Sequence, residues 1–410
     1  MSDFIQLITA LAIILAAAKA GGYLSTRIGQ PSVFGELLVG VILGPSLVNL
    51  TQLSFITNGH LGAFINDLGE IGVLLLMFLA GLELNIKDLA KNTKVSAISG
   101  TLGVLVPIIL GFLCGRLFGF DVNASAFLGL TLAATSVSIS AQTLIELNFL
   151  RTPVGLSLLG AAVFDDILVI LLLSFVTALG ETGSGFVQIL AIVIWMLVYF
   201  VVSIVPGLWL LPRLTHLINK LPISQGLITY SLIVVLIYGI AAELIGGMAA
   251  ITGTFLAGLM FARLSEKNKI EEGLKPIAYS FFVPIFFVSI GLKINLRDFD
   301  LNSIGLLLVI LVIAIVSKVL GAGYGAKLGG FSWLESYQLG IGMVSRGEVG
   351  LIVASIGSGL GLINNTELTI IVITILVSTL VTPILLKNAF ISPPAFLLPK
   401  RVKVINQENE

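Results

Sequence analysis

Residues 73–89 read VLLLMFLAGLELNIKDL, and residues 283–299 read VPIFFVSIGLKINLRDF. The two stretches begin 210 residues apart, and Val, Gly, Leu, Asn and Asp recur in register. Each is an apolar run that ends in a polar segment, as a membrane-spanning helix does where it reaches water. The same spacing relates the apolar segments that follow each stretch, which indicates that the two halves of the chain share one plan.

The composition is that of a protein whose surface faces lipid. Of 410 residues, 57% are hydrophobic and 11% are charged, whereas soluble domains carry about 25% charged residues. The mean hydropathy is +1.10. With 22 basic and 22 acidic residues, nothing favours a nucleic-acid partner, and the single cysteine, Cys114, excludes an internal disulfide. The two histidines form no metal cluster with other side chains, and no cofactor is expected.

Apolar segments recur along the whole chain. A membrane-spanning helix needs about 20 mostly apolar residues, and turn formers or charges separate thirteen such segments. They begin near residues 4, 31, 68, 96, 125, 153, 185, 225, 246, 276, 301, 333 and 368. The predicted fold class is an all-α membrane protein with about 13 transmembrane helices.

Lysine and arginine are divided unequally between alternate loops. One set of loops, together with the C-terminal tail, contains 16 of these residues, and the other contains only Arg116, Lys293 and Arg297. Positive charge stays on the cytoplasmic side of a membrane. The chain is therefore predicted to begin outside and to end in the cytoplasm.

This orientation gives the two repeats opposite directions. Residues 73–89 run into a cytoplasmic loop, and residues 283–299 run into an outer loop. Two six-helix halves of inverted topology, linked by the seventh span, are typical of secondary transporters. The weaker alternative is that Gly-Leu-x-(Ile/Leu)-Asn is simply a common way to end a helix.

Two adjacent acids lie near the middle of the sixth span, PVGLSLLGAAVFDDILVILLLSF (residues 153–175). Ionisable groups inside a span are costly and mark ion or proton pathways. Burial and a neighbouring negative charge both favour the neutral form of a carboxyl group. A site at Asp165 and Asp166 would therefore hold either protons or a cation, which is the chemistry of antiport. The alternative is a structural pair neutralised by its neighbours.

Two other spans contain polar stretches at corresponding positions of the halves. Residues 131–143, TLAATSVSISAQT, include Thr135, Ser136 and Ser138, and residues 341–359, IGMVSRGEVGLIVASIGSG, include Arg346 and Glu348. Such stretches favour two discontinuous helices that cross in the membrane. The alternative is that these residues line ordinary helix interfaces.

A lysine interrupts the eleventh span, VILVIAIVSKVLGAGYGAKL (residues 309–328). A buried ammonium group requires a partner, and Asp165 is the obvious candidate for Lys318. The alternative is that Lys318 extends along the helix to the cytoplasmic surface.

These residues resemble those of a known family. FDDI (164–167), ATSVS (134–138) and SRGEVGLI (345–352) are similar to the monovalent cation:proton antiporter-2 family, and the similarity covers residues 4–387. Bacterial NapA-type sodium/proton antiporters match best. The related Kef-type potassium-efflux proteins commonly have Gln-Asp in place of Asp-Asp, and a soluble nucleotide-binding domain after the membrane part. Here about 22 residues without G-x-G-x-x-G follow the last span.

The resemblance implies roles for the polar residues. Asp166 would be the main cation-binding carboxylate, Asp165 would pair with Lys318 when no ion is bound, and Thr135 would supply a ligand or a hydrogen bond. The helix crossing would be supported by Ser136, Ser138, Arg346 and Glu348. Sodium would be a transported substrate at Asp165, Asp166 and Thr135, together with protons.

The resemblance also implies an assembly and a division of the chain. A homodimer would lie in the bilayer of a prokaryotic inner or plasma membrane. Each chain would contain a dimer domain (1–90 and 222–299), a core or transport domain (91–184 and 300–390), a linker helix (185–221) and a cytoplasmic tail (391–410). The core would move like an elevator against the dimer domain.

The predicted function is secondary-active sodium/proton antiport rather than an enzymatic reaction. If Lys318 releases a proton when sodium breaks its pair with Asp165, two protons exchange for one sodium and transport is electrogenic. A potassium/proton antiporter of the same fold stays open as an alternative. A cation channel would need polar rings or a carbonyl filter. An intramembrane aspartyl protease needs two facing acids, whereas neighbours on one helix point about 100° apart.

Overall fold

The computed structural model describes residues 2–50, 60–84, 91–179, 185–293, 297, 299, 303–394 and 397. Some helical side chains, including that of Glu348, are not described. Most of the predicted cytoplasmic tail, 391–410, lies outside the described residues. Within them the chain is helical throughout and has no β-strand.

In the part of the chain that the structure describes, ten helices are long and apolar enough to cross a membrane, which confirms the prediction of a polytopic α-helical protein. Eight are single helices: α1 (Asp3–Arg27), α3 (Leu61–Glu83), α5 (Thr93–Leu117), α8 (Pro153–Leu179), α9 (Gly185–Lys220), α10 (Gly226–Leu244), α14 (Ile304–Gly329) and α17 (Asn365–Ile391). Two are composite: α6 with α7 (Val122–Ala133 and Val137–Glu146), and α12 (Lys267–Ile277) with the π-helical turn η2 (Ala278–Phe282) and α13 (Val283–Leu292).

The remaining helices of the described residues are shorter. They are α2 (Ser32–Leu43), α11 (Ala250–Phe261), α15 (Trp333–Gly342) and α16 (Glu348–Gly359). At about 1.5 Å per residue, a helix of 12 residues such as α2 or α11 covers only part of a bilayer.

The chain is interrupted at both predicted polar stretches. α6 gives way to α7 at residues 134–136, and α15 gives way to α16 at residues 343–347. Backbone groups inside a membrane must be paired within the protein, and the two breaks pair with each other. The amide of Ser136 donates to the carbonyl of Ser345 over 2.9 Å, and the Ser345 hydroxyl donates to the carbonyl of Ser136 over 2.6 Å.

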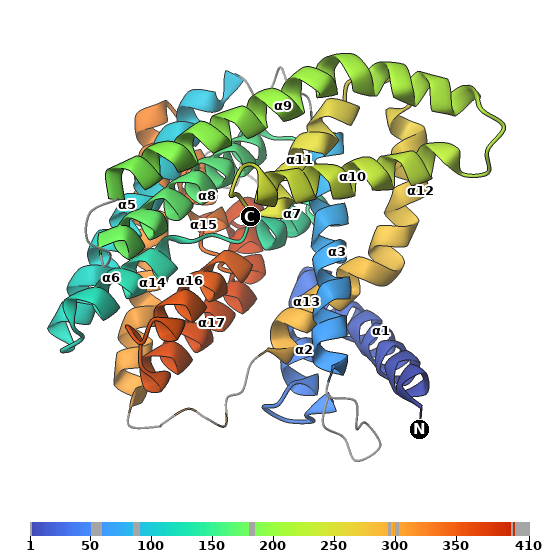
Figure 1. Ribbon diagram of the computed structural model, residues 1–410. Helices are drawn as coiled ribbons and strands as arrows, with labels where there is room; N and C mark the ends of the chain where they lie inside the picture. Colours follow the sequence, from blue (N-terminus) through green and yellow to red (C-terminus); the bar gives the residue numbers. More distant parts are fainter. Residues whose placement is uncertain are drawn as a thin grey trace, which may run out of the picture.

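The helices form two groups, which Figure 1 shows side by side. The α3 group contains α1, α2, α3, α10, α11, α12, η2 and α13, and the α8 group contains α5, α6, α7, α8, α14, α15, α16 and α17. Both breaks belong to the α8 group. α9 extends across the top of the view in Figure 1 and packs on helices of both groups.

Helices within one group approach to backbone contact at glycines. A Cβ atom added to Gly81 of α3 would lie 2.3 Å from the carbonyl oxygen of Phe255 in α11. In the α8 group, a Cβ atom added to Gly321 of α14 would lie 2.4 Å from the carbonyl oxygen of Leu102 in α5. Because no side chain fits at such positions, each group is tightly packed internally.

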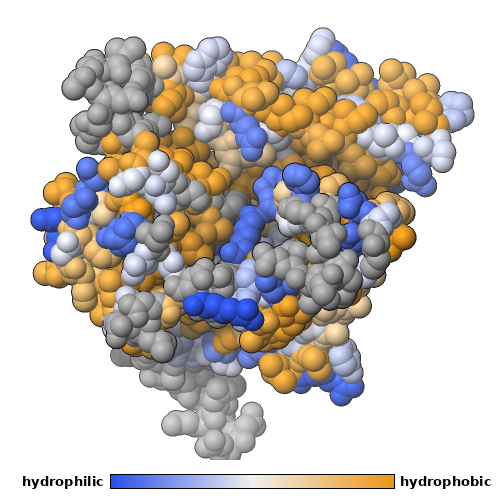
Figure 2. Space-filling model, turned by 60° about the horizontal axis from the view of Figure 1, so that its bottom comes forward, coloured by the Kyte–Doolittle hydropathy of each residue, from blue (hydrophilic) through white to orange (hydrophobic). Residues whose placement is uncertain are grey.

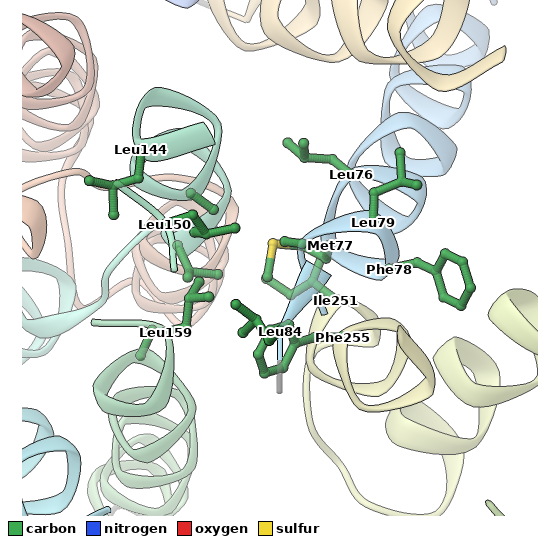
Figure 3. Close-up of a cluster of buried hydrophobic side chains, with 14 of the residues drawn as sticks. Leu76, Met77, Phe78, Leu79, Leu84, Leu144, Leu150, Leu159, Ile251 and Phe255 are labelled. Carbon is green, nitrogen blue, oxygen red and sulfur yellow. The ribbon is translucent and has the colours of Figure 1, made fainter. Parts of the chain in front are cut away.

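Contact between the groups is made by bulky side chains. Figure 3 shows Leu76 and Met77 of α3 on one side, with Leu144 of α7 and Leu159 of α8 facing them. All four are buried, and Phe255 of α11 belongs to the same cluster. The groups therefore meet through an apolar surface.

The outside of the molecule is largely apolar as well. Figure 2 shows the face at the bottom of Figure 1, where hydrophilic residues gather near the middle and hydrophobic residues surround them. Bulky apolar side chains such as Trp195, Val201 and Trp209 of α9 are more than half exposed. A surface of this kind suits lipid rather than water.

Candidate cation-binding site

A buried ion pair lies beside the first helix break. Asp165 in the middle of α8 and Lys318 in α14 both have no exposed side-chain surface, and Lys318 Nζ lies 2.9 Å from Asp165 Oδ2. Lys318 Nζ also donates to the Thr135 hydroxyl over 2.6 Å, and that hydroxyl donates to the same carboxylate oxygen. The structure thus brings three predicted site residues together and excludes the alternative in which Lys318 extends to the surface.

The break explains the position of Thr135. Thr135 is two residues before the first residue of α7, Val137, and the N-terminus of a helix favours a nearby negative charge. The Thr135 hydroxyl therefore contacts Asp165 close to a helix N-terminus, where a carboxylate is already stabilised.

The second oxygen of Asp165 has different surroundings. Oδ1 is buried and accepts no hydrogen bond from the described residues. A buried oxygen without a donor is costly. A proton or a cation at this oxygen would satisfy it. The surroundings of Asp165 therefore suit an ion that binds reversibly.

Asp166 faces the other group of helices. Its side chain is 6% exposed, and its Oδ2 accepts a hydrogen bond of 3.2 Å from the hydroxyl of Thr252 in α11. Adjacent residues on a helix point about 100° apart, so one acid faces the break and its neighbour faces the boundary between the groups.

Two cavities lead to Asp166 along that boundary. One of about 170 Å³ is lined by residues from exposed Thr93, at the start of α5, to buried Thr252. A small adjoining cavity is lined by Asp166 and Val137 from one group and by Met77 from the other. Val163, Thr252 and Phe255 line both cavities, so the two adjoin between the surface at Thr93 and Asp166.

Arg346 fills the second break without touching the carboxylates through a hydrogen bond. It is fully buried and donates to the carbonyls of Leu132, Ala314 and Val344 at 2.6–3.3 Å. Leu132 lies in the last turn of α6, where carbonyls lack partners within the helix. The hydroxyl of Thr379 in α17 donates to the Arg346 carbonyl. Leu132 and Val344 lie at the breaks, so in the described residues Arg346 satisfies two backbone carbonyls there, and it also bonds to the Ala314 carbonyl within α14.

The other predicted support residues have simpler surroundings. The hydroxyls of Ser136 and Ser138 lie 3.1 Å apart, and both residues are buried. Glu348 is the first residue of α16, and its side chain lies outside the described part of the structure.

Two contacts that join the groups were not predicted. One is between Thr252 and Asp166. The other is at the end of α7, where Glu146 accepts bonds of 2.7 Å and 2.5 Å from the amide and the hydroxyl of Ser32, the first residue of α2. A hydroxyl in a short apolar helix has no distinctive sequence pattern, and Glu146 reads as an ordinary acid at a helix end.

The chain was compared with known proteins. Residues 11–391 match the family described as sodium/hydrogen exchanger, transmembrane. The Na(+)/H(+)-K(+) antiporter GerN of Bacillus cereus is 39% identical over 380 residues, which cover 93% of this chain and 95% of that protein. The Na(+)/H(+) antiporter of Enterococcus hirae is 37% identical over 383 residues, which cover 93% and 97%.

A solved structure supports the fold. The sodium proton antiporter MjNhaP1 from Methanocaldococcus jannaschii aligns with a TM-score of 0.59 at 17% identity, over 95% of this chain and 98% of that one. Broken helices around buried charges are the architecture of a secondary transporter. The family match is more specific: the chain belongs to the sodium/hydrogen exchanger family, as its motifs predict.

Proposed function

We propose that the protein exchanges sodium for protons across a membrane, with Asp165 and Asp166 holding either protons or the cation. The observation that carries this proposal is the position of Asp166, which lines the inner of two adjoining cavities, the outer of which reaches Thr93, and which follows the buried Asp165 of the Asp165–Lys318 pair. Relatives named Na(+)/H(+) antiporters, which match along nearly the whole chain, support the same activity.

The ion pair provides a means of coupling. In the empty site Lys318 neutralises Asp165, and Thr135 bonds to the shared oxygen. A sodium ion at Asp166 attracts Asp165 and Thr135 as further ligands, and Lys318 then loses its counter-charge. A buried ammonium without a counter-charge is costly, so Lys318 gives up its proton. Together with the proton displaced from Asp166, two protons leave for each sodium, and one net charge crosses the membrane per cycle.

We extend the proposal to topology. The short helices α2 and α11, together with the broken pair α15–α16, complete thirteen spans in two inverted six-helix halves. The distribution of Lys and Arg favours a multi-pass chain with its N-terminus outside and its C-terminus in the cytoplasm.

The two helix groups suggest the moving parts. We assign the α3 group to a dimer domain, the α8 group to a transport domain and α9 to the linker between them. Backbone contact at glycines within each group, and bulky side chains between the groups, support movement of the α8 group as one body. The homodimer is part of this proposal.

The described conformation corresponds to a site open to the cytoplasm. The larger cavity reaches Thr93 at the start of α5, which lies between Lys91 and Lys94 at the end of the helix that the charge distribution places inside. Near the C-terminal end of α2, the apolar side chain of Val41 is buried with Leu376 of α17. The groups are thus closed toward the outer side.

A potassium/proton exchanger is the second candidate, because the name of the relative GerN includes potassium as well as sodium. The two candidates use the same site and differ in the cation that Asp166 prefers.

Proteoliposomes with a pH-sensitive dye inside test the proposal. We expect sodium to drive proton movement in the wild type and Asp166→Asn to abolish it, while Asp67→Asn, at an exposed acid of α3, is unchanged. Because protons compete with the cation, the half-saturating sodium concentration should rise as the pH falls. Adding lithium or potassium instead ranks the cations.

The outcomes are distinct. Cation-driven proton movement in Asp166→Asn would remove Asp166 from its role, and a wild type inactive with every cation would contradict antiport. Exchange that ignores an imposed membrane potential would contradict the two-for-one stoichiometry.

A further inference from the structure

Thr252 is one point at which the α3 group touches the predicted cation site. Its hydroxyl lies on α11 and donates to Asp166 Oδ2 over 3.2 Å. The side chain is 5% exposed. A buried hydroxyl and a buried carboxylate on different groups of helices are thus held together by a direct hydrogen bond.

The hydroxyl also stands on the access path. Thr252 lines the cavity that reaches the surface at Thr93 and the smaller cavity that contains Asp166. An ion that enters from the Thr93 side therefore passes Thr252 immediately before it reaches Asp166.

A threonine hydroxyl suits both states of such a site. It is one donor with two acceptor lone pairs. When no cation is bound, the hydroxyl donates to Asp166 and stabilises the negative charge of that carboxylate, which attracts a cation. Toward a bound cation it can turn and offer its oxygen, the kind of ligand that hard cations prefer.

Thr252 does not belong to the part that carries the acids. A Cβ atom added to Gly258 of α11 would lie 2.2 Å from the carbonyl oxygen of Phe78 in α3, so α11 is locked to α3. Asp166 and Thr135 belong to the other group. Any displacement of the α8 group relative to the α3 group separates Asp166 from Thr252.

We propose that Thr252 is a positioning residue that serves the cation site in the inward-open state only. This inference rests on the proposed function and deepens it. The four groups Thr135, Asp165, Asp166 and Lys318 travel together, whereas Thr252 stays behind. The site is therefore completed by one more hydroxyl on the cytoplasmic side, and its affinity for the cation differs between the two sides of the membrane.

Thr252→Val tests this inference, because valine keeps the shape and removes the hydroxyl. Sodium-driven proton movement is measured in everted vesicles, which expose the cytoplasmic face, and in right-side-out vesicles, which expose the outer face. The ratio of the cytoplasmic to the outer half-saturating concentration should rise about tenfold, as expected for losing a hydrogen bond to a charged group. The maximal rate should change less than about twofold.

Two variants serve as controls. Thr252→Ser keeps the hydroxyl and should behave like the wild type. Thr254→Val removes a buried hydroxyl from the same helix, but this one bonds to the carbonyl of Ile251 in α11 itself, so the ratio should not move. If Thr252→Val does not reach the membrane, Thr252→Ala removes the same hydroxyl from a smaller side chain.

An unchanged ratio, equal shifts on both sides, a shift on the outer side alone, or Thr252→Ser behaving like Thr252→Val would each overturn the inference. These outcomes presuppose wild-type exchange in both kinds of vesicle. Absence of that exchange bears on the proposed function instead.

Discussion

The two helix breaks contact each other, but they hold different chemistry. At the first break Thr135 faces a carboxylate and an ammonium group, Asp165 and Lys318, whose charges neutralise each other. At the second, Arg346 donates to backbone carbonyls from three segments of the chain. One break holds groups that can exchange partners, and the other holds a cation committed to the backbone.

This difference separates two roles that the sequence presents alike. Lys can release its proton when buried without a counter-charge, whereas Arg stays charged in proteins. The Asp165–Lys318 pair at the first break can therefore separate when an ion binds, whereas Arg346 keeps its charge and its bonds to the backbone. Variants at the first break should change both transport and stability, whereas variants at the second should change stability.

Arg346→Leu should have the largest effect on stability. It leaves the carbonyls of Leu132 and Val344 without their side-chain donor, at about 2 kcal/mol each, and removes one donor from the Ala314 carbonyl within α14, at about 1 kcal/mol, or about 5 kcal/mol together. Thermal denaturation of the detergent-solubilised protein, followed by size-exclusion chromatography, measures the loss. Arg346→Lys keeps the charge with fewer hydrogen-bond donors, and its stability should lie between those of Arg346→Leu and the wild type. A Leu variant as stable as the wild type would contradict a structural role for the second break.

Lys318→Met should come next, at about 4 kcal/mol, because it leaves the buried Asp165 charge without a partner. Lys318→Met combined with Asp165→Asn removes both charges and should recover at least half of that loss. The same heating assay compares the single and double variants. A double variant less stable than Lys318→Met would show that the two charges do not depend on each other.

Gly347→Ala tests the contact between the breaks. The added Cβ atom would lie 2.7 Å from the Ser136 hydroxyl oxygen, and such overpacking costs about 2 kcal/mol. Ser136→Gly in the same chain removes the obstructing atoms and should restore the thermal midpoint to near that of Ser136→Gly alone. If the two changes were additive, the breaks would not constrain each other.

Thr379→Val should have the smallest effect, about 1 kcal/mol, because it removes one hydrogen bond to the Arg346 carbonyl. Thr374→Val is the matched control on the same helix, since its buried hydroxyl bonds to the carbonyl of Ile370 in α17. A smaller midpoint shift for Thr379→Val than for Thr374→Val would argue against support of the second break by α17.

Much of this architecture can be predicted from the sequence because charged residues inside an apolar segment are easily recognised. Asp165, Asp166 and Lys318 stand out for that reason, and the clustered hydroxyls around Thr135 predict the first break. Helix ends are less legible. The span predicted to begin near Leu68 begins at Leu61, because its first polar turns continue the helix beyond its apolar part.

The pairing of Lys318 with Asp165 could be predicted, but other partners across the molecule could not. The bond between Thr252 and Asp166 joins residues 86 positions apart and depends on how α11 packs against α8. Arg346 suggests an acidic partner from its charge alone, yet its hydrogen bonds go to backbone carbonyls, and two of these, of Leu132 and Val344, lie at the helix breaks.

The apolar boundary of Figure 3 has a thermodynamic consequence. Side chains such as Leu76, Met77 and Leu159 attract their neighbours by dispersion, which has no preferred direction, and methionine adapts readily to new surroundings. Movement of one helix group along the other would therefore replace one set of apolar contacts with another of similar energy. Two resting positions that differ by only about 1–3 kcal/mol are within reach of the differential binding energy of a single ion. In the movement proposed above, occupancy of one carboxylate pair would decide which position of the α8 group is populated.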